Sequence, residues 1–495
     1  MNLHRPGGSS KIKTPRPHLA LNVFLCLLLV CAGLFAQQEP ETEYKAREQK
    51  LLIDIPMTVA EITVANLVGN FYWRIWGPDS EAAYFTFDSM RNNLNPSAWH
   101  YERGLATDTF LVNQIFHPYA GGIYFASARS NNLNFYWSML SPVFGSLQWE
   151  IMGEADKPAT NDLITTAVSG IAMGEILHRL YLELDKGGMA GKIGATVLSP
   201  IDRITAAIRA YGPEEGPGKI SDASLTFGFS WLYARFLESS EDTISWNTPS
   251  ANIGLDLVYG NPYTAHSKTP FDQFDLNISL ALAIPQLYNL SFITDGYLAS
   301  WRLADDELNQ ASYGLTLHFD AFVTDKGFMD LKNGRENLSF NANSLDYTVK
   351  WRRVLNKSVG LSLKTHIGFS PWAVADYNGG VIKDDFNLFS FGGNVKFFLE
   401  LQQIREDAKN GQALSFNLCF YDTWKVPKTS GFNNNTFFLA SKIAYSLPFV
   451  GKFSFYAAEN FLFLHCRPAG DAAADWPDIT RWYNNAQLGI KVSFS

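Results

Sequence analysis

From residue 221 to the end of the sequence, apolar and polar side chains alternate in one segment after another. One segment carries Phe274, Leu276, Ile278, Leu280, Leu282 and Ile284, with Asp275, Asn277 and Ser279 between them. Successive side chains of a β-strand point to opposite faces, so a period of two gathers the apolar residues on one face. Twelve such segments begin near residues 224, 251, 273, 288, 312, 340, 358, 390, 413, 436, 453 and 485. This half of the chain is therefore predicted to form an antiparallel β-sheet of about twelve strands.

The length and number of these segments favour a transmembrane barrel over a soluble sandwich. Each is long enough for the ~9–11 residues with which a tilted strand crosses a bilayer, and bacterial single-chain barrels have even strand numbers. Aromatic residues near segment ends fit the interfacial girdles of such barrels, namely Tyr259, Tyr313, Tyr347, Trp351 and Tyr445. Mean hydropathy is only −0.08 although 46% of the residues are apolar, which suits one-faced strands better than long apolar helices. We expect a barrel at residues 221–495, surrounded by outer-membrane lipid.

The polar residues that alternate with the apolar ones on these strands are expected to face the lumen. They are Asp256, Asp275, Asn277, His318, Asp320, Asp346, Lys350, Lys364, His366, Asn394, Lys396, Glu400 and Lys442. Because acids and bases are mixed, the lumen is predicted to be crossed by ion pairs and to be narrow or closed. Cys419 and Cys466 fall on strands nine and eleven with a strand between them, which predicts no disulfide. Glu459 lies in phase with outward-facing residues, and a bulge at residues 457–458 would turn it inward.

The last segment carries a second pattern. Gln487, Gly489, Val492 and Phe494 give a polar residue, a glycine and two alternating apolar residues that end in an aromatic ring. This pattern resembles the signal by which outer-membrane barrels are recognised for assembly. It predicts that the barrel-assembly machinery is a partner of this chain.

Residues 1–36 are predicted to be an export signal. Arg5, Lys11, Lys13 and Arg16 precede an apolar core, and small residues end at Ala36 before a polar stretch. Small residues followed by a polar start are typical of a signal-peptidase site, so we expect cleavage after Ala36. An uncleaved membrane anchor is the alternative, which the short apolar core disfavours. The expected location is the outer membrane, reached through a cleaved signal peptide.

The segment between the leader and the barrel loses the period of two. Residues 37–100 are predicted to be irregular or helical, residues 101–212 to be a helical domain, and residues 213–220 to be a linker rich in Gly and Pro. The expected helices are Thr109–Arg129, Phe135–Met152, Asn161–Leu184 and Pro200–Tyr211. Thr160, Asn161 and Asp162 follow Pro158 and predict an N-cap for the third of them. The fold class is thus α+β and multidomain, with an N-terminal helical domain followed by an antiparallel transmembrane β-barrel.

The helical domain carries a series of motifs. The series is Asp108, Asn113-Gln114, His117-Pro118-Tyr119, Gly122-x-Tyr124-Phe125, Ala128-Arg129, Gly145-Ser146, Trp149-Glu150, Glu154, Asn161-Asp162, Gly170, Gly174-Glu175 and Arg179. It resembles the bacterial family grouped as domain of unknown function 3943, over about residues 80–212. The resemblance implies an exported envelope protein, and the family brings no established reaction.

Four residues of this domain form the candidate catalytic set: His117, Glu150, Glu154 and Asp162. A histidine and carboxylates are suited to general acid–base work or to metal binding. The competing interpretation is structural, with Arg129 and Arg179 forming buried ion pairs with Glu150, Glu175 or Asp162. Charged side chains inside helix packings are far more often paired than catalytic, which favours the structural interpretation. No cofactor and no metal site is predicted.

Two hypotheses for function remain. The first is an outer-membrane barrel with a periplasm-side helical module, acting as a narrow channel, an anchor or an envelope scaffold. The second is an envelope lipid-modifying enzyme whose site is the His/Glu/Asp set of the helical domain. A periplasmic or lipid partner fits either hypothesis. Nucleic acid does not, because 40 Lys and Arg face 48 Asp and Glu and no basic stripe follows the leader.

Overall fold

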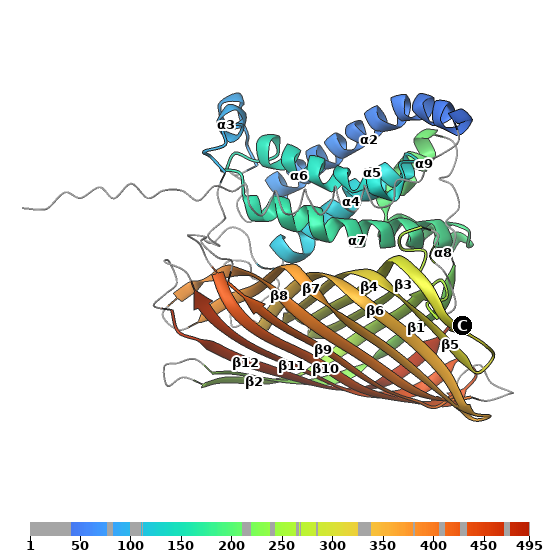
Figure 1. Ribbon diagram of the computed structural model, residues 1–495. Coiled ribbons are helices and arrows are strands. Elements are labelled where there is room, and N and C mark those ends of the chain that lie inside the picture. Colours follow the sequence, from blue (N-terminus) through green and yellow to red (C-terminus); the bar gives the residue numbers. More distant parts are fainter. Residues whose placement is uncertain are drawn as a thin grey trace, which may run out of the picture.

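The computed structural model consists of a helical region followed by a closed β-barrel, which confirms the predicted fold class (Figure 1). The structure describes residues 41–76, 83–99, 110, 112–209, 219–237, 243–263, 267, 269–283, 286–324, 338–379, 382–404, 411–425, 433–469 and 476–494. The predicted signal segment 1–36 lies outside the described residues, and so does most of the predicted linker.

Twelve antiparallel strands form the barrel. They are β1 (Ile220–Leu237), β2 (Thr243–Tyr259), β3 (Phe274–Ala283), β4 (Gln286–Asp305), β5 (Asn309–Thr324), β6 (Leu338–Asn356), β7 (Val359–Gly379), β8 (Ile382–Gln403), β9 (Ala413–Trp424), β10 (Asn433–Val450), β11 (Phe453–Ala469) and β12 (Ile479–Ser493). Each strand pairs with its neighbours in the chain, and β12 pairs with β1, Ser493 lying opposite Ser224. Closure leaves no free sheet edge, so every strand can satisfy its backbone polar groups within a bilayer.

The predicted alternation separates the lumen from the outer wall. On β5, Thr316, His318 and Asp320 are fully buried in the lumen. Leu315, which comes directly before them, points the other way and is exposed on the outer wall. Outward side chains elsewhere are large and apolar, as for Phe229 and Ile367, which are 80% and 63% exposed. An apolar outer wall around a polar interior is the pattern of a membrane barrel.

The helical region is a layer of packed helices. Its elements are α2 (Glu41–Trp76), α3 (Phe87–Asn93), the π-helix η1 (Val112–Phe116), α4 (His117–Ser130), α5 (Phe135–Ser138), α6 (Leu140–Met152), α7 (Thr160–Asp185), α8 (Met189–Leu198) and α9 (Pro200–Arg209). Two glycine pairs bring α4 and α7 into backbone contact. A Cβ on Gly170 would lie 2.5 Å from the carbonyl carbon of Gly121, and one on Gly174 would lie 2.6 Å from Phe125 Cβ.

The helices lie along the outer wall of the barrel, with α7 next to the strands (Figure 1). Towards its N-terminus, Ile164 and Val168 share a buried cluster with Trp372. Towards its C-terminus, Leu180 shares another with Phe274. Since inward and outward positions alternate, the barrel residues of these clusters belong to the wall that would otherwise face lipid. We refer to residues 54–209 as the helical module.

Two local features differ from the predictions. Helix α7 begins at Thr160, one residue before the predicted Asn161, and its N-cap is Ala159, which has no capping side chain. Instead the Ala159 amide donates to Glu150 Oε2 of α6 at 2.7 Å, so a tertiary contact replaces the predicted local cap. The predicted bulge at residues 457–458 is wrong. Pairing of β11 with β12 is continuous there, and Glu459 is exposed on the outer wall.

Two further features concern the cysteines and the helices. Cys419 on β9 and Cys466 on β11 are buried and free, as predicted. The helical unit extends N-terminally beyond the predicted boundary at residue 101, because α2 packs on α4 and α6. Judged by length and mean hydropathy, none of the helices among the described residues could cross a membrane by itself.

Candidate functional site: the lumen and the core of the helical module

Lysines and aspartates form ion pairs across the lumen. Lys350 Nζ of β6 lies 2.7 Å from Asp275 Oδ2 of β3 and also pairs with Asp295 of β4. Lys364 Nζ of β7 lies 2.6 Å from the same Asp275 oxygen. Because β3 and β7 are not neighbours in the ring, these pairs run through the interior and not along the wall. The predicted ion pairs within the lumen are therefore confirmed.

A second network lies beside the first. Lys396 Nζ of β8 is 2.5 Å from Asp320 Oδ2 of β5 and 3.2 Å from Asp346 Oδ2 of β6. Tyr421 of β9 donates its hydroxyl proton to the same Asp320 oxygen at 2.6 Å. All four side chains are fully buried. The network links strands on widely separated parts of the wall and fills the interior between them.

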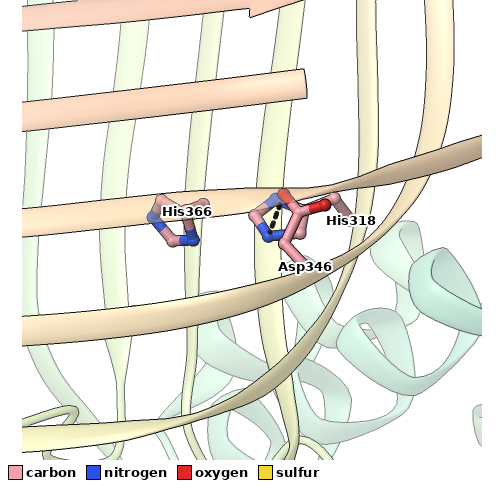
Figure 2. Close-up of side chains that lie close together, drawn as sticks. All are labelled: His318, Asp346 and His366. Atoms are coloured by element: carbon pink, nitrogen blue, oxygen red, sulfur yellow. Dashed lines mark ion pairs between the residues drawn. The ribbon is translucent and has the colours of Figure 1, made fainter. Parts of the chain in front are cut away.

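His318, Asp346 and His366 come together next to this second network (Figure 2). Their ligand atoms lie within 4.8 Å of one another, and within the described ranges no other three His, Cys, Asp or Glu residues do so. His318 Nε2 is 3.2 Å from Asp346 Oδ2, and the two imidazole rings meet edge to face with centroids 4.9 Å apart. Two imidazoles and a carboxylate form a donor set that a divalent transition metal accepts.

The surroundings of these three residues do not suit a metal ion. The Lys396 ammonium is 3.2 Å from the same Asp346 oxygen that contacts His318, so a cation already occupies that carboxylate. A second cation at this oxygen would meet strong repulsion in a buried setting. The Thr348 hydroxyl engages His366 Nδ1 at 2.8 Å. We therefore interpret the group as part of the polar filling of the lumen.

This convergence was not found from the sequence. The three residues were assigned to the lumen one by one from their phase, but their meeting depends on strand register. Pairing places Thr316 opposite Asp346 and Thr348 opposite His366. A residue's phase gives the face on which it lies, and only the register gives its height along the barrel.

Aromatic rings also meet across the lumen. Phe322 of β5 and Phe438 of β10 lie five strands apart in the ring, yet their ring centroids are 4.9 Å apart. Phe340 of β6 stacks on Phe438 at 4.4 Å and contacts Tyr421 at 5.1 Å. The walls themselves approach each other, since Cα atoms of β6 and β12 come within 8 Å. The cross-section of the barrel is therefore flattened, and side chains bridge its interior.

A small cavity with polar and apolar lining residues remains inside the barrel. Its volume is about 40 Å³. It is lined by Asn289, Asn417, Lys442, Asn460, Asn485 and neighbouring residues. A cavity of this size with several polar partners accommodates water molecules.

In the helical module, Glu175 connects two arginines. Its Oε2 is 2.7 Å from Arg129 Nε of α4, and its Oε1 is 2.7 Å from Arg179 Nε one turn along α7. Burial by itself would raise the pKa of Glu175, but the charges of Arg129 and Arg179 outweigh it and hold that pKa below its usual range. Arg179 also donates to the carbonyl oxygen of Pro270 at 2.7 Å, in the segment between β2 and β3. This group thus ties the module to the barrel.

Three polar groups of the predicted catalytic set are held by structural contacts. Burial lowers the pKa of His117 to about 4, and His117 Nδ1 lies 3.1 Å from Thr166 Oγ1. Glu150 accepts from the Ala159 amide, and Asp162 accepts from Asn161 Nδ2 at 2.8 Å. Glu154 is partly buried. The four side chains do not form a grouping of three close metal-ligand atoms in the described parts of the chain.

A buried carboxylate that the sequence did not single out lies at the centre of the module. Glu61 of α2 accepts from Ser127 at 2.7 Å and Asn131 at 2.8 Å through Oε2, and from Thr205 at 2.9 Å through Oε1. Ser127 lies on α4, Asn131 follows its last residue, and Thr205 lies on α9. No local sequence motif connects Glu61 with partners so far away in the chain.

The predicted assembly signal lies on β12. Gln487 and Gly489 are opposite Ser230 and Gly228 of β1, where the barrel closes. Phe494 follows the strand, is about half exposed on the outer side, and donates its amide to Ala223 O at 2.7 Å.

The comparison with protein families gives one match. Residues 104–201 match the family of the domain of unknown function DUF3943. This segment runs from the residues before η1 to the first turn of α9 and includes Arg129, Glu175 and Arg179. The closed barrel follows it, so the resemblance inferred from the motifs is confirmed.

The remaining comparisons give little. No curated protein matches the chain. Among solved structures, the Ralstonia pickettii toluene transporter TbuX is 7% identical and covers 55% of this chain and 90% of its own, with a TM-score of 0.22. The KdgM porin is 8% identical, covers 54% and 99%, and has a TM-score of 0.21. The anion-selective porin from Comamonas acidovorans is 8% identical, covers 56% and 100%, and has a TM-score of 0.20. With identities of 7–8% and TM-scores of 0.20–0.22, these similarities are too weak to assign a transport function.

The fold itself supports an outer-membrane location. Closed antiparallel barrels satisfy all backbone hydrogen bonds without water, and the apolar outer wall of this one is suited to lipid.

Proposed function

We propose that this protein is a closed outer-membrane anchor that holds the DUF3943 helical module against its wall. The observation that carries the proposal is the contact of Phe322 with Phe438, because it joins strands from nearly opposite sides of the ring. A conducting barrel keeps a continuous water path along its axis. The aromatic contacts and the lysine–aspartate pairs that cross the interior support a barrel without such a path.

The charge arrangement also favours an anchor over a channel. Lys350 and Lys396 are fully buried and each contacts two aspartates. Such pairs are costly to break, because each broken contact leaves an unpaired charge away from water. A permeating ion would have to displace them.

Export and assembly complete the proposal. The chain is exported by the signal segment 1–36, with cleavage after Ala36, and is recognised by the barrel-assembly machinery through Gln487, Gly489, Val492 and Phe494. Both steps are suggested by sequence patterns of known types.

Conductance in planar lipid bilayers tests the closed state. The folded protein, identified by its heat-modifiable gel mobility, is expected to show no steady ohmic current. The matched comparison is the double variant Phe322→Ser with Phe438→Ser, which removes the aromatic contact but no ion pair, and for which we expect rare small current steps. If the unaltered protein gave a steady current in proportion to the number of inserted molecules, the barrel would be a channel.

A further inference from the structure

The helical module presents an apolar face on the side away from the barrel. On α2 the exposed large side chains between Ile55 and Ile75 include Val64, Leu67, Val68 and Phe71, which are 56–64% exposed. Further large apolar side chains are exposed on α8 (Met189, Ile193 and Val197) and on α9 (Ile204 and Ile208). A contiguous apolar surface on a protein exterior requires an apolar environment or partner.

The buried face of the same helix is polar. Asp54, Thr58, Glu61, Asn66 and Asn70 of α2 are each at most 6% exposed. A helix on the surface of a water-soluble domain has the opposite arrangement, with its apolar stripe inward. Helix α2 is therefore inverted relative to a helix that faces water.

The inward polar groups of α2 have partners inside the module. Asn70 donates to Gly153 O at 2.6 Å, and Asn66 donates to Gln148 Oε1 at 2.9 Å. Glu61 has the three partners described above, and Asp54 pairs with Arg209. Polar side chains of helices in lipid face the bundle interior and pair there. The mean hydropathy of α2 is therefore low because of polar side chains that face the interior of the module.

The packing of α4 on α7 agrees with this arrangement. Gly121 and Gly170 let the two backbones meet so closely that a Cβ on either glycine would overlap the other helix. Close contact through small residues is typical of helices packed within membranes, where apolar burial gives no advantage over lipid.

We propose that the outer face of the module, formed by α2, contacts the acyl chains of the bilayer around the barrel. The inference rests on the proposed outer-membrane anchor, since the module lies against a wall that is continuous with the lipid-facing wall of the barrel (Figure 1). Ile55 to Ile75 covers about 30 Å at 1.5 Å per residue, about the thickness of the hydrocarbon layer.

Charged residues bound this apolar face. Asp54 and Arg209 form an ion pair at the start of the face, and Arg74 lies at its end over the ring of Tyr84. No charged side chain of α2 between Ile55 and Trp73 is exposed, since Glu61 is buried. Apolar residues between two charged borders match a layer of hydrocarbon between two layers of headgroups.

Spin-label accessibility in vesicles of phosphatidylethanolamine and phosphatidylglycerol tests the inference. Labels are attached to Leu67→Cys on the module, Ile367→Cys on the uncovered wall and Lys186→Cys at the end of α7. Oxygen partitions into lipid and a chelated nickel reagent stays in water. We expect Leu67 and Ile367 to favour oxygen over nickel several-fold more than Lys186 does.

Each other outcome has a distinct meaning. If Ile367 favours oxygen but Leu67 behaves like Lys186, the lipid contact is wrong and the membrane anchor stands. If Ile367 also reports water, the membrane anchor itself fails. If Leu67 is shielded from both reagents and its spectrum shows dipolar broadening that disappears on mixing with unlabelled protein, a second copy of the chain covers the face and the proposal is overturned.

Discussion

Phe322 and Phe438 meet across the lumen with ring centroids 4.9 Å apart, although their strands are separated by four others around one side of the ring. Phe340 stacks on the same Phe438. Through these contacts the barrel has a core of its own, as a soluble domain has. The stability of the barrel should therefore depend on inward aromatic side chains as well as on strand pairing.

The first prediction concerns this core. Phe340→Ala removes a fully buried ring and should lower the free energy of unfolding by about 3–5 kcal/mol. The measurement is the urea concentration at which tryptophan fluorescence reports unfolding in detergent micelles. Phe229→Ala on the exposed outer wall is the control, and an equal loss in both variants would contradict the role of the core.

The second prediction concerns Lys396. Its replacement by Met leaves Asp320 and Asp346 buried without their ammonium partner, which should destabilise the barrel by about 3–5 kcal/mol. Adding Asp320→Asn should restore part of the loss, because it removes one uncompensated charge. The exposed pair of Arg467 with Asp478 is the control, and Arg467→Met should cost less than about 1 kcal/mol. A barrel whose melting temperature is unchanged by Lys396→Met would refute the prediction.

The third prediction concerns Glu175. Its pKa in the folded protein lies below the unfolded value, so its ion pairs stabilise the module fully above the unfolded carboxyl pKa of about 4.3. This stabilisation is lost as the pH falls through the folded pKa. Glu175→Gln should reduce protease resistance of the module at neutral pH, and should remove the part of its acid sensitivity that depends on this group.

Replacement of an arginine tests the same ion pairs of Glu175. Arg129→Ala leaves Glu175 with Arg179 alone and should also lower protease resistance. If His117→Ala or Glu150→Gln instead gave a fully folded protein with a changed lipid composition of the envelope, the module would be an enzyme and not a structural unit.

The fourth prediction concerns the contact of α4 with α7. Gly170→Ala would place a Cβ 2.5 Å from the Gly121 carbonyl carbon, so the helices must move apart at a cost of about 1–3 kcal/mol. Gly194→Ala is the matched control, because its Cβ would meet nothing nearer than Leu184 Cδ1 at 3.9 Å. Thermal unfolding of both variants, followed by circular dichroism, should show a lower midpoint only for Gly170→Ala.

The fifth prediction concerns assembly. Phe494→Asp should reduce the amount of barrel in the outer membrane and increase its degradation before insertion. Phe453→Asp is the control, because Phe453 also lies on the outer wall beside Val492 but is outside the signal. If both variants reach the membrane in equal amounts, the likeness to the assembly signal is accidental.

The sequence by itself determined the barrel, the order of the two parts and the DUF3943 likeness of the first part. The barrel could be predicted because alternation is a local property. Each of the segments, such as Phe274 to Leu282, shows its two faces without reference to any other segment. The inward position of Lys350, Asp320 and His366 followed from the same phase. The free state of the two cysteines followed from the order of the strands, because one strand lies between theirs.

Tertiary structure alone decided which residues meet. Phase does not give register, so the contacts of Lys396 with Asp320 and of Phe322 with Phe438 were beyond the sequence. The place of α2 was missed because its polar face is buried and its apolar face is exposed, which is the reverse of the usual rule. The position of the module against the barrel wall explains this inversion. The surrounding medium decides which face of a helix turns outward, and lipid favours the apolar one.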